Sequence, residues 1–361
     1  MIVRANQIIT KEEFDSLKSY FTEKGFEIKD VSSDTVRLFG VIGDTSKLDI
    51  DDVRNLKGVL DVTRIQAPDY SKYRNENSKK VLIVGLGLMG GAYAQRLYKK
   101  GYYVYGTDLN QNSIDYAINN NYIIDGSKDP EKYIEDIDII ILCIYPKAIM
   151  SFLEKYKDRF NENQLITDIC GVKTSFVKDA TRLALPARYL SHHPMAGREK
   201  IGIEYSSECI FEGANFIITP VDESLDEDIK LLNQLGLDLG FKRITVIDIN
   251  KHDRMIGFTS QLTHAIAVSL VNSDRDVDTK NYIGDSYRDL TRIAMINESL
   301  WSELFLENRI YLLNHINSFE KQLNLLKEAL LDDDKEALKK LFISSTKIRK
   351  EMEKWESYKL I

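Results

Sequence analysis

The stretch Val81-Leu82-Ile83-Val84-Gly85-Leu86-Gly87-Leu88-Met89-Gly90 decides the fold of most of the chain. Val81–Val84 is a continuous aliphatic run, which is typical of a buried strand in a parallel sheet. Gly85, Gly87 and Gly90 then form the pattern GxGxxG between that strand and a helix. The first glycine permits the tight turn, the second lets the backbone approach a pyrophosphate, and the third allows close helix–strand packing.

An acidic residue strengthens this signal. Asp108 follows a second β-rich run, Tyr103–Thr107, and lies 18 residues after Gly90. A carboxylate there accepts hydrogen bonds from the adenosine ribose and repels a 2′-phosphate, so NAD is favoured over NADP. The alternative is a glycine turn without a ligand and an ordinary surface aspartate. The predicted cofactor-binding residues are Gly85, Leu86, Gly87, Leu88, Met89, Gly90 and Asp108.

Strand and helix patterns alternate after this motif, which predicts a doubly wound, Rossmann-like α/β domain over residues 80–250. Its last strand is expected at Arg243–Ile247. Before it, residues 1–70 show the order βαββαβ of a small ferredoxin-like α+β domain. Thr10 there is an expected helix N-cap, with Glu13 as its capping-box partner. Residues 71–79 are predicted to be a polar linker.

Residues 251–361 are predicted to form an all-helical substrate and dimerisation domain. One long helix carries apolar residues at 4-3-4-3-4 spacing, and Asp332–Asp334 interrupts it. Such a seam is buried either within one subunit or across a two-fold axis, and we expect a homodimer. The seam consists of Leu312, Ile316, Phe319, Leu323, Leu326 and Leu330.

Composition narrows the function classes. The 361 residues carry 49 Lys and Arg against 56 Asp and Glu, a net charge of −7, which disfavours nucleic acid and anionic membrane surfaces as partners. No apolar run approaches the length of a membrane span, and no signal peptide is apparent. The three cysteines form no CxxC pair and give no metal-ligand spacing, so we expect no metal and a cytoplasmic protein.

Several polar residues are candidates for chemistry. His193 follows a predicted strand and precedes Pro194, so it is placed to accept a proton from a hydroxyl as hydride leaves the same carbon. Its neighbour His192 points the opposite way if the strand continues. The dipeptide His252-Asp253 precedes a helix on which Ser260 and His264 share one face. Arg288 and Arg292 are also four apart, and they are either a solvated face or a carboxylate clamp.

Together these motifs resemble the prephenate dehydrogenase family, which includes the arogenate dehydrogenases of tyrosine biosynthesis. The resemblance covers residues 79–361. It rests on the glycine motif, Thr167–Lys173, His193–Gly197, Ser260–Ala265 and Arg288–Ala294, with Trp301 nine residues after Arg292.

The resemblance implies a role for each matched residue. His193 takes the proton of the ring hydroxyl while hydride passes to NAD, and Arg292 binds the ring carboxylate that leaves as CO2. Ser260, His264 and Trp301 line the substrate pocket. Glu199 and Asp289 match an ionic gate found in some members. Where some members carry an active-site serine this chain has Gly171, and a water or Thr174 is the expected replacement.

The implied reaction is the NAD-dependent oxidative decarboxylation of prephenate to 4-hydroxyphenylpyruvate. The alternatives are an arogenate dehydrogenase that yields tyrosine directly, a β-hydroxyacid dehydrogenase that would use a catalytic lysine, and a non-catalytic NAD-binding regulator. Residues 1–70, through Val41–Thr45 and Gly58-Val59, resemble the ferredoxin-like domain of one class of DAHP synthases. That resemblance implies a module that senses tyrosine or mediates assembly, and a purely structural appendage remains open.

Overall fold

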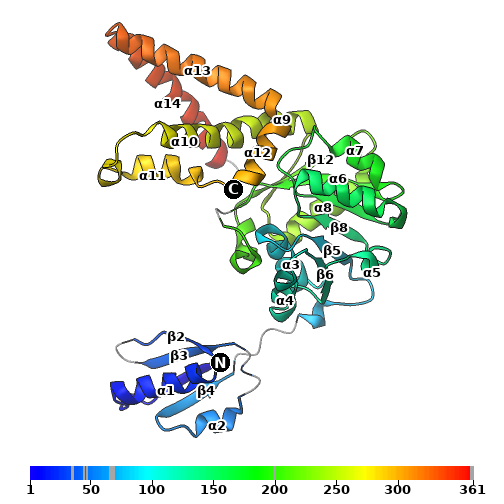
Figure 1. The fold of residues 1–361 in the computed structure, drawn as a ribbon, viewed down its shortest axis with the longest axis vertical. Helices are drawn as coiled ribbons and strands as arrows, with labels where there is room; N and C mark the ends of the chain where they lie inside the picture. Colours follow the sequence, from blue (N-terminus) through cyan, green and yellow to red (C-terminus); the bar gives the residue numbers. More distant parts are fainter. Residues whose placement is uncertain (34–35, 44, 46–47, 65–69, 198–199, 358–361) are drawn as a thin grey trace. The chain divides into compact units, whose positions relative to one another are not determined.

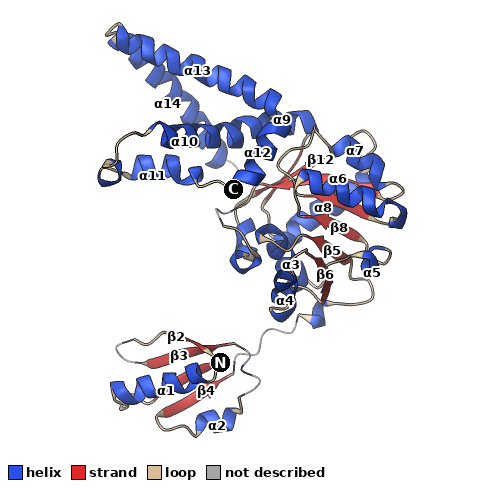
Figure 2. Cartoon of the chain, viewed as in Figure 1, coloured by secondary structure: helices blue, strands red, loops and turns tan. Residues whose placement is uncertain are grey.

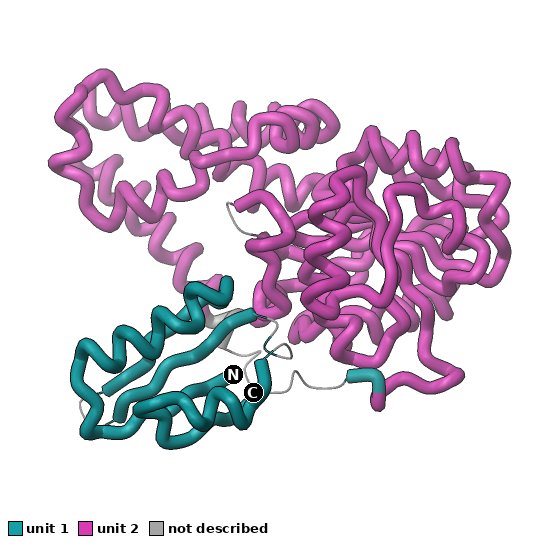
Figure 3. The backbone as a smooth tube through the Cα atoms, turned by 60° about the horizontal axis from the view of Figure 1, so that its bottom comes forward, with its two compact units in different colours: residues 1–71 teal, residues 72–361 magenta. Residues whose placement is uncertain are grey.

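The computed structural model describes residues 1–33, 36–43, 45, 48–64, 70–197 and 200–357. The chain divides into two units, residues 1–71 and 72–361, which are coloured separately in Figure 3. The predicted linker, residues 71–79, begins at the division between them. There the 3-10 helix η2 (Ser71–Tyr73) leads into Arg74, whose guanidinium lies 4.1 Å from the ring centroid of Tyr98 in the second unit.

The first unit has the predicted βαββαβ order, and its antiparallel sheet has the strand order β2-β3-β1-β4. Its core includes Phe14, Phe21 and Phe39. The predicted capping box is confirmed, because Glu13 N–H donates to Thr10 Oγ1 and Thr10 N–H donates to Glu13 Oε2. The elements are β1 (Ile2–Ala5), α1 (Lys11–Glu23), β2 (Glu27–Asp30), β3 (Arg37–Ile42), α2 (Ile50–Arg54) and β4 (Val59–Thr63).

The second unit begins with the predicted doubly wound domain. Its six-stranded parallel sheet has the order β10-β9-β8-β5-β6-β7, so the strand order reverses between β5 and β8. Figure 2 shows the neighbouring strands β8, β5 and β6. Ligands of such sheets bind outside the carboxyl ends of the strands at that reversal. The strands are β5 (Lys80–Val84), β6 (Tyr103–Thr107), β7 (Asp125–Ser127), β8 (Ile139–Leu142), β9 (Leu165–Asp168) and β10 (Arg188–Tyr189).

Helices cover both faces of this sheet, which explains why β5 is apolar throughout. Val81 and Ile83 face one core with α3 (Leu88–Lys99), α4 (Gln111–Asn119) and α8 (Asp226–Leu239). Leu82 and Val84 alternate with them and face a second core. That second core is built with α5 (Glu131–Ile134), α6 (Pro146–Tyr156) and α7 (Val177–Ala184).

The expected last strand of this sheet belongs to a separate sheet. β13 (Arg243–Val246) pairs in parallel with β12 (Asn215–Thr219), which pairs antiparallel with β11 (Ser191–Pro194). β11 follows β10 after the single residue Leu190, which is too short a connection for a parallel crossover. The chain therefore changes sheets at Leu190. Short 3-10 helices complete the domain: η3 (Lys157–Arg159), η4 (Ile203–Tyr205) and η5 (Glu208–Phe211).

The remainder of the unit is helical, as predicted. A five-residue π-helix, η6 (Gly257–Gln261), joins α9 (Ile249–Ile256) to α10 (Leu262–Ser273). None of the helices in the described part of the chain is long and apolar enough to span a membrane. The other elements are η7 (Thr279–Asn281), α11 (Asp285–Thr291), η8 (Arg292–Ala294), α12 (Glu298–Glu307), α13 (Arg309–Leu331) and α14 (Lys335–Ser357).

The predicted heptad seam lies on α13, which packs along α14 after the predicted break at Asp332–Asp334 (Figure 1). Leu312, near the start of the seam, is buried. Leu323 and Leu330, further along it, have 54% and 60% of their surface exposed. Three of the six seam residues are therefore exposed within one chain, and only Leu312 is buried.

Candidate active site

A cleft of about 840 Å³ lies between the doubly wound domain and the helices that follow it. One side is formed by the glycine-rich turn, by Cys143–Pro146 at the end of β8 and by Ile169–Gly171 at the end of β9. The other side comes from η6, α10, η8 and α12. The predicted site residues that line it are Gly87, Leu88, Met89, Gly90, His193, Ser260, His264, Arg292 and Trp301.

The three glycines of the turn differ in what requires them. Gly85 has φ +93°, and a Cβ there would lie 2.7 Å from the carbonyl oxygen of Cys143. A Cβ on Gly90 would overlap the Gly85 carbonyl oxygen at 1.8 Å. A Cβ on Gly87 would meet nothing within 4 Å. The protein's own packing thus accounts for Gly85 and Gly90, whereas Gly87 leaves open space at the N-terminus of α3, the kind of place at which phosphates bind.

Asp108 follows β6 and is held against this turn. Its Oδ2 accepts the Leu86 N–H at 2.7 Å, and its Oδ1 accepts the Asn110 N–H at 2.8 Å. These bonds fix the carboxylate beside the glycine turn, where a dinucleotide-binding fold is expected to place the residue that bonds the ribose. The turn, the helix N-terminus and Asp108 therefore lie together, as the predicted dinucleotide site requires.

His193 heads a chain of hydrogen bonds that we call the relay, made of His193, His252 and Asp253. His193 Nδ1 lies 2.9 Å from His252 Nε2, and His252 Nδ1 lies 2.7 Å from Asp253 Oδ1. A carboxylate only accepts, so His252 Nδ1 carries the proton and its Nε2 accepts from His193 Nδ1–H. The lone pair of His193 is therefore on Nε2. An ideal Cβ on Gly171, in the lining of the cleft, lies 3.8 Å from this Nε2.

Burial keeps the two imidazoles of the relay neutral. Burial first, and then the neighbouring His252 and Lys173, hold the pKa of His193 well below its ordinary value. Burial likewise lowers the pKa of His252. Burial alone would raise the pKa of Asp253, but hydrogen bonds from His252 and Thr174 hold it below the ordinary value. The relay therefore presents an unprotonated Nε2 backed by an ionised carboxylate.

The facing wall combines an aromatic stack with a cation. The His264 ring stacks on Trp301, with centroids 3.7 Å apart and ring planes at 28°. His264 Nδ1 donates to the Ser260 carbonyl oxygen at 2.9 Å. Ser260 itself belongs to the π-helix, a distortion often found at functional sites. Arg292, in η8, adds a guanidinium to the same lining.

The chain matches a family of known structure. Family models match residues 93–245 (prephenate dehydrogenase, nucleotide-binding domain) and residues 248–344 (prephenate dehydrogenase, dimerization domain). The crystal structure of prephenate dehydrogenase from Aquifex aeolicus, in complex with hydroxyphenyl propionate and NAD+, is 31% identical with a TM-score of 0.70. The match covers 77% of this chain and 99% of that one. The chain belongs to the prephenate dehydrogenase family.

Other relatives agree. The prephenate dehydrogenase of Lactococcus lactis subsp. cremoris is 29% identical over 76% of this chain and 78% of its own length. That of Bacillus subtilis is 26% identical over 74% of each chain. A third family model, the DAHP synthase ferredoxin-like domain, matches residues 1–67, as the sequence predicted.

Not all of the predicted site residues lie together. Arg288 is an exposed residue of α11 outside the lining, and it pairs with Asp285 at 2.6 Å. Asp289 is exposed and also outside the lining. α11 ends at Thr291, and Arg292 enters the cleft from the 3-10 turn that follows. Glu199, the other predicted gate residue of this family, lies outside the described residues.

Gly171 stands where some prephenate dehydrogenases have a serine. Thr174, one of the two expected replacements, is committed elsewhere, because its hydroxyl donates to Asp253 Oδ2 at 2.5 Å. Its backbone N–H donates to the same oxygen at 2.7 Å. Thr174 therefore supports the carboxylate end of the relay.

Sequence reasoning did not assign a role to His252 or Asp253. Both side chains are fully buried, and His252 meets His193 across 59 positions of sequence. The signal in the sequence was an adjacent His-Asp pair on the helix that leads to Ser260. Without the fold, nothing in that pair shows that its imidazole reaches His193.

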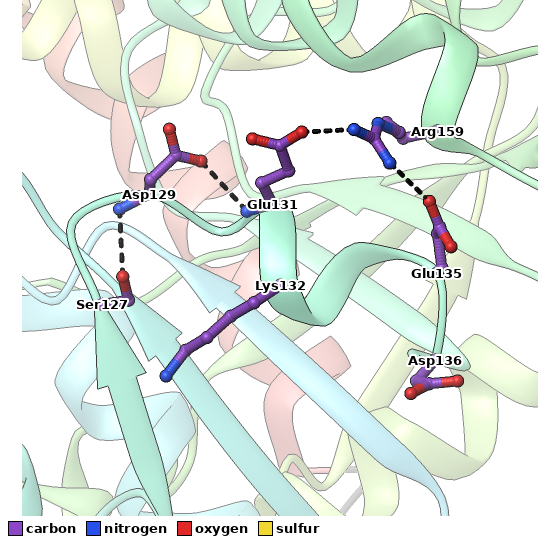
Figure 4. Close-up of a pocket in the computed structure, with 7 residues that line it drawn as sticks. All are labelled: Ser127, Asp129, Glu131, Lys132, Glu135, Asp136 and Arg159. Carbon is purple, nitrogen blue, oxygen red and sulfur yellow. Dashed lines mark hydrogen bonds and ion pairs between the residues drawn. The ribbon is translucent and has the colours of Figure 1, made fainter.

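A second hollow, of about 640 Å³, lies at the surface of the doubly wound domain (Figure 4). Several of its charged side chains are engaged with one another. Arg159 pairs with Glu131 and, at 2.8 Å, with Glu135, while Asp129 accepts the Glu131 N–H at 3.0 Å. Nothing in this hollow resembles the convergent groups of the cleft. In the described ranges no three His, Cys, Asp or Glu side chains are grouped to hold a metal ion.

Proposed function

We propose that this chain catalyses the NAD-dependent oxidative decarboxylation of prephenate to 4-hydroxyphenylpyruvate. The observation that carries the proposal is the relay, because it leaves an unprotonated His193 Nε2 in the cleft that also contains the dinucleotide turn. A dehydrogenase that oxidises an alcohol needs both a proton acceptor and a hydride acceptor in one place. NAD, when bound at the glycine turn, supplies the hydride acceptor.

The relay would move one proton out and back. His193 Nε2 takes the proton of the ring hydroxyl as the C–H bond on the same carbon breaks and its electron pair leaves as hydride. The resulting imidazolium is stabilised by His252, whose own proton is held by the Asp253 carboxylate. The ring is now a dienone. Its C–carboxylate bond breaks, CO2 leaves, the electron pair makes the ring aromatic, and the new phenolate recovers the proton from His193.

The facing wall would hold the substrate. Arg292 is the cation of that wall, and its planar fork suits the ring carboxylate. Trp301 and His264 offer a flat stacked surface on which a six-membered ring can lie. Ser260 completes the substrate pocket. Arg288 and Asp289 lie outside the lining, so any effect of theirs on the substrate would act from the cleft's surroundings.

The alternative substrate is arogenate, which has an amino group where prephenate has a side-chain keto group. The test is NADH formation with prephenate and then with arogenate, each with NAD and with NADP. Turnover of prephenate with NAD supports the proposal, and faster turnover of arogenate replaces it. NAD binding without turnover of either substrate would favour the non-catalytic regulator.

The His193→Asn variant tests the assigned base. Asparagine preserves a polar group of similar size but accepts no proton, so turnover should fall by about 10²-fold or more while NAD binding is retained. The matched control is His315→Asn, because His315 lies on α13 and bonds the Arg254 carbonyl oxygen outside the cleft. Equal turnover in the two variants would exclude His193 as the base.

A homodimer through α13 and α14 is the second part of the proposal, and it agrees with the dimerization-domain match. Leu323 and Leu330 on α13 and Phe342 and Ile343 on α14 are each more than half exposed in one chain. Apolar surface of this extent along two adjacent helices is typical of an interface. Light scattering should give twice the mass of one chain, and Leu323→Glu should lower it. A monomeric wild-type protein would refute this part.

For residues 1–70 we propose a regulatory role, with tyrosine as the effector. The support is the DAHP synthase ferredoxin-like match over residues 1–67. The unit has its own core and is compact by itself, so its removal should leave a folded enzyme. Inhibition by tyrosine should be present in the full chain and lost on deletion of residues 1–70. Equal inhibition in both would reject the sensing role. A cytoplasmic location stays a prediction.

A further inference from the structure

Lys173 is a buried cation with no part in the proposed proton transfer. Its side chain has no exposed surface, and its Nζ donates to Asp168 Oδ1 at 2.8 Å and to the His192 carbonyl oxygen at 2.7 Å. A lysine is almost never fully buried unless it is paired. The Asp168 carboxylate is equally buried and also accepts the Tyr189 hydroxyl at 2.8 Å.

Lys173 contacts both ends of the relay. Its ammonium holds the carbonyl of the peptide that joins His192 to His193, which fixes the backbone from which the His193 imidazole projects. Its backbone N–H donates to both oxygens of Asp253, at 2.9 and 3.1 Å. One residue thus ties β11, which carries the proton acceptor, to α9, which carries the carboxylate.

The His192 ring is clamped as well. Tyr93 Oη lies 2.8 Å from its Nε2, and Thr167 Oγ1 lies 2.6 Å from its Nδ1. Burial, first of all, and then the charge of Lys173 lower the pKa of His192 to about 3, so the ring stays neutral. Two hydroxyls hold the His192 ring, and Lys173 holds the His192 carbonyl oxygen. The bond from Lys173 is therefore the contact that lies next to the His193 backbone.

We propose that Lys173 is a positioning residue that sets the placement of the His193 imidazole against His252 and Asp253. The inference deepens the proposed function and rests on it. The rival explanation is that Lys173 and Asp168 are only a buried ion pair of the core. A core pair would affect stability alone, whereas a positioning residue also affects the chemical step and the proton affinity of His193.

The proton affinity of His193 is a useful readout because the groups around it are known. His252 and Asp253 approach from α9, and His192 is the adjacent residue on β11. Lys173 bonds the His192 carbonyl oxygen. The cleft around His193 is also lined by Arg292, His264, Glu298 and the exposed Lys200. After burial and His252, Lys173 is the group that most lowers the pKa of His193, so loss of its charge should raise that pKa.

The experiment compares two double variants. Lys173→Met/Asp168→Asn removes both charges, so that no unpaired ion stays buried. Arg188→Met/Asp228→Asn is the control, because it removes an ion pair of 2.8 Å between β10 and α8 that does not touch the relay. For the first we expect kcat to fall about tenfold or more, with KM for NAD within about twofold. The acidic limb of its pH profile should shift to higher pH.

A measurement independent of turnover is the NMR titration of the five histidines, with the His193 signal assigned from His193→Asn. The His193 titration should move to higher pH in Lys173→Met/Asp168→Asn and should not in Asp168→Asn, which keeps the ammonium. If the double variant does not fold, the single Asp168→Asn variant is titrated in its place. It keeps the Lys173 ammonium, so the pKa of His193 should not rise in it, and a rise would overturn the inference.

The outcomes separate the two hypotheses. A folded Lys173→Met/Asp168→Asn enzyme with wild-type kcat and an unmoved His193 titration overturns the positioning role. A wild-type chain that does not oxidise prephenate refutes the proposed function instead, and the NMR titration still tests the placement of His193.

Discussion

Exchange of Asp108 for asparagine should change the cofactor that the enzyme accepts. The carboxylate lies at the end of β6, bound to the Leu86 N–H at 2.7 Å and to the Asn110 N–H at 2.8 Å. A 2′-phosphate on the adenosine ribose would approach it closely. Asparagine has nearly the same shape and still accepts one of these bonds. Asp108→Asn therefore isolates the charge.

The size of the effect follows from the charges. The phosphate carries about −2 and the carboxylate −1, so two unit repulsions act at roughly 4 Å. Each amounts to about 1 kcal/mol in water and more in a protein of lower dielectric constant. Asp108 is partly exposed, so the aqueous value is appropriate, and the sum is about 2 kcal/mol. That corresponds to roughly 30-fold in kcat/KM for NADP. Loss of a charged bond to the ribose should lower kcat/KM for NAD by about fivefold.

The assay follows formation of NADH or NADPH at saturating prephenate. The result is the ratio of kcat/KM for NAD to kcat/KM for NADP. Asp138→Asn is the matched control, because Asp138 also accepts a backbone N–H, that of Lys80 at 2.7 Å, but lies at the amino end of the sheet. The control should keep the wild-type ratio. If Asp108→Asn changes the ratio by less than about twofold, the carboxylate does not select the cofactor and the assignment fails.

Three further predictions concern the relay and its surroundings. Asp253→Asn should lower kcat by about 10- to 100-fold with little change in KM for NAD, measured by initial rates, because the amide no longer fixes the His252 tautomer. Gly171→Ser should lower KM for prephenate by roughly 2- to 10-fold, because an added Cβ meets nothing closer than 3.8 Å and the hydroxyl adds one hydrogen bond beside His193. Gly171→Ala is the control, and an unchanged KM in Gly171→Ser contradicts the prediction. His192 has a folded pKa of about 3, so the unfolded chain binds the extra proton between that value and about 6.5, and stability should fall by up to roughly 1.4 kcal/mol per pH unit as pH drops through this window. Urea unfolding of the wild type and of His192→Asn at several pH values checks this. Equal changes of the unfolding free energy with pH in the two proteins would refute it.

The parts of the fold that the sequence predicted are those specified by neighbouring residues. Four aliphatic residues and three spaced glycines define β5 and the start of α3, and Thr10 with Glu13 defines the start of α1. Sheet membership is different. Whether β11 continues the parallel sheet depends on the connection at Leu190 and on pairing with β12, which lies more than 20 residues further along the chain. Period and propensity carry no information on that pairing.

The site shows the same division. His193, Ser260, His264 and Trp301 were predicted from motifs and line one cleft in the structure. Arg288 and Arg292 looked equivalent at four-residue spacing, but α11 ends between them and only Arg292 is in the lining. His252 and Asp253 were visible as residue types without a role, because a hydrogen bond to a residue 59 positions away is a product of tertiary packing.

The change of sheet at Leu190 explains how the proton acceptor comes to depend on the helical part of the chain. β11 leaves the parallel sheet and presents His193 to α9, the first helix after the doubly wound domain, so the relay draws its base from one part and its carboxylate from the other. Asn308, at the start of α13, donates to the Asp253 carbonyl oxygen at 2.9 Å and to Gln261 Oε1 at 2.7 Å. The long helix that we expect at the dimer interface therefore contacts the relay residue Asp253 through its N-cap residue, Asn308. The side chain of Asn308 links the helix of the proposed dimer interface to the residue that carries the carboxylate of the relay.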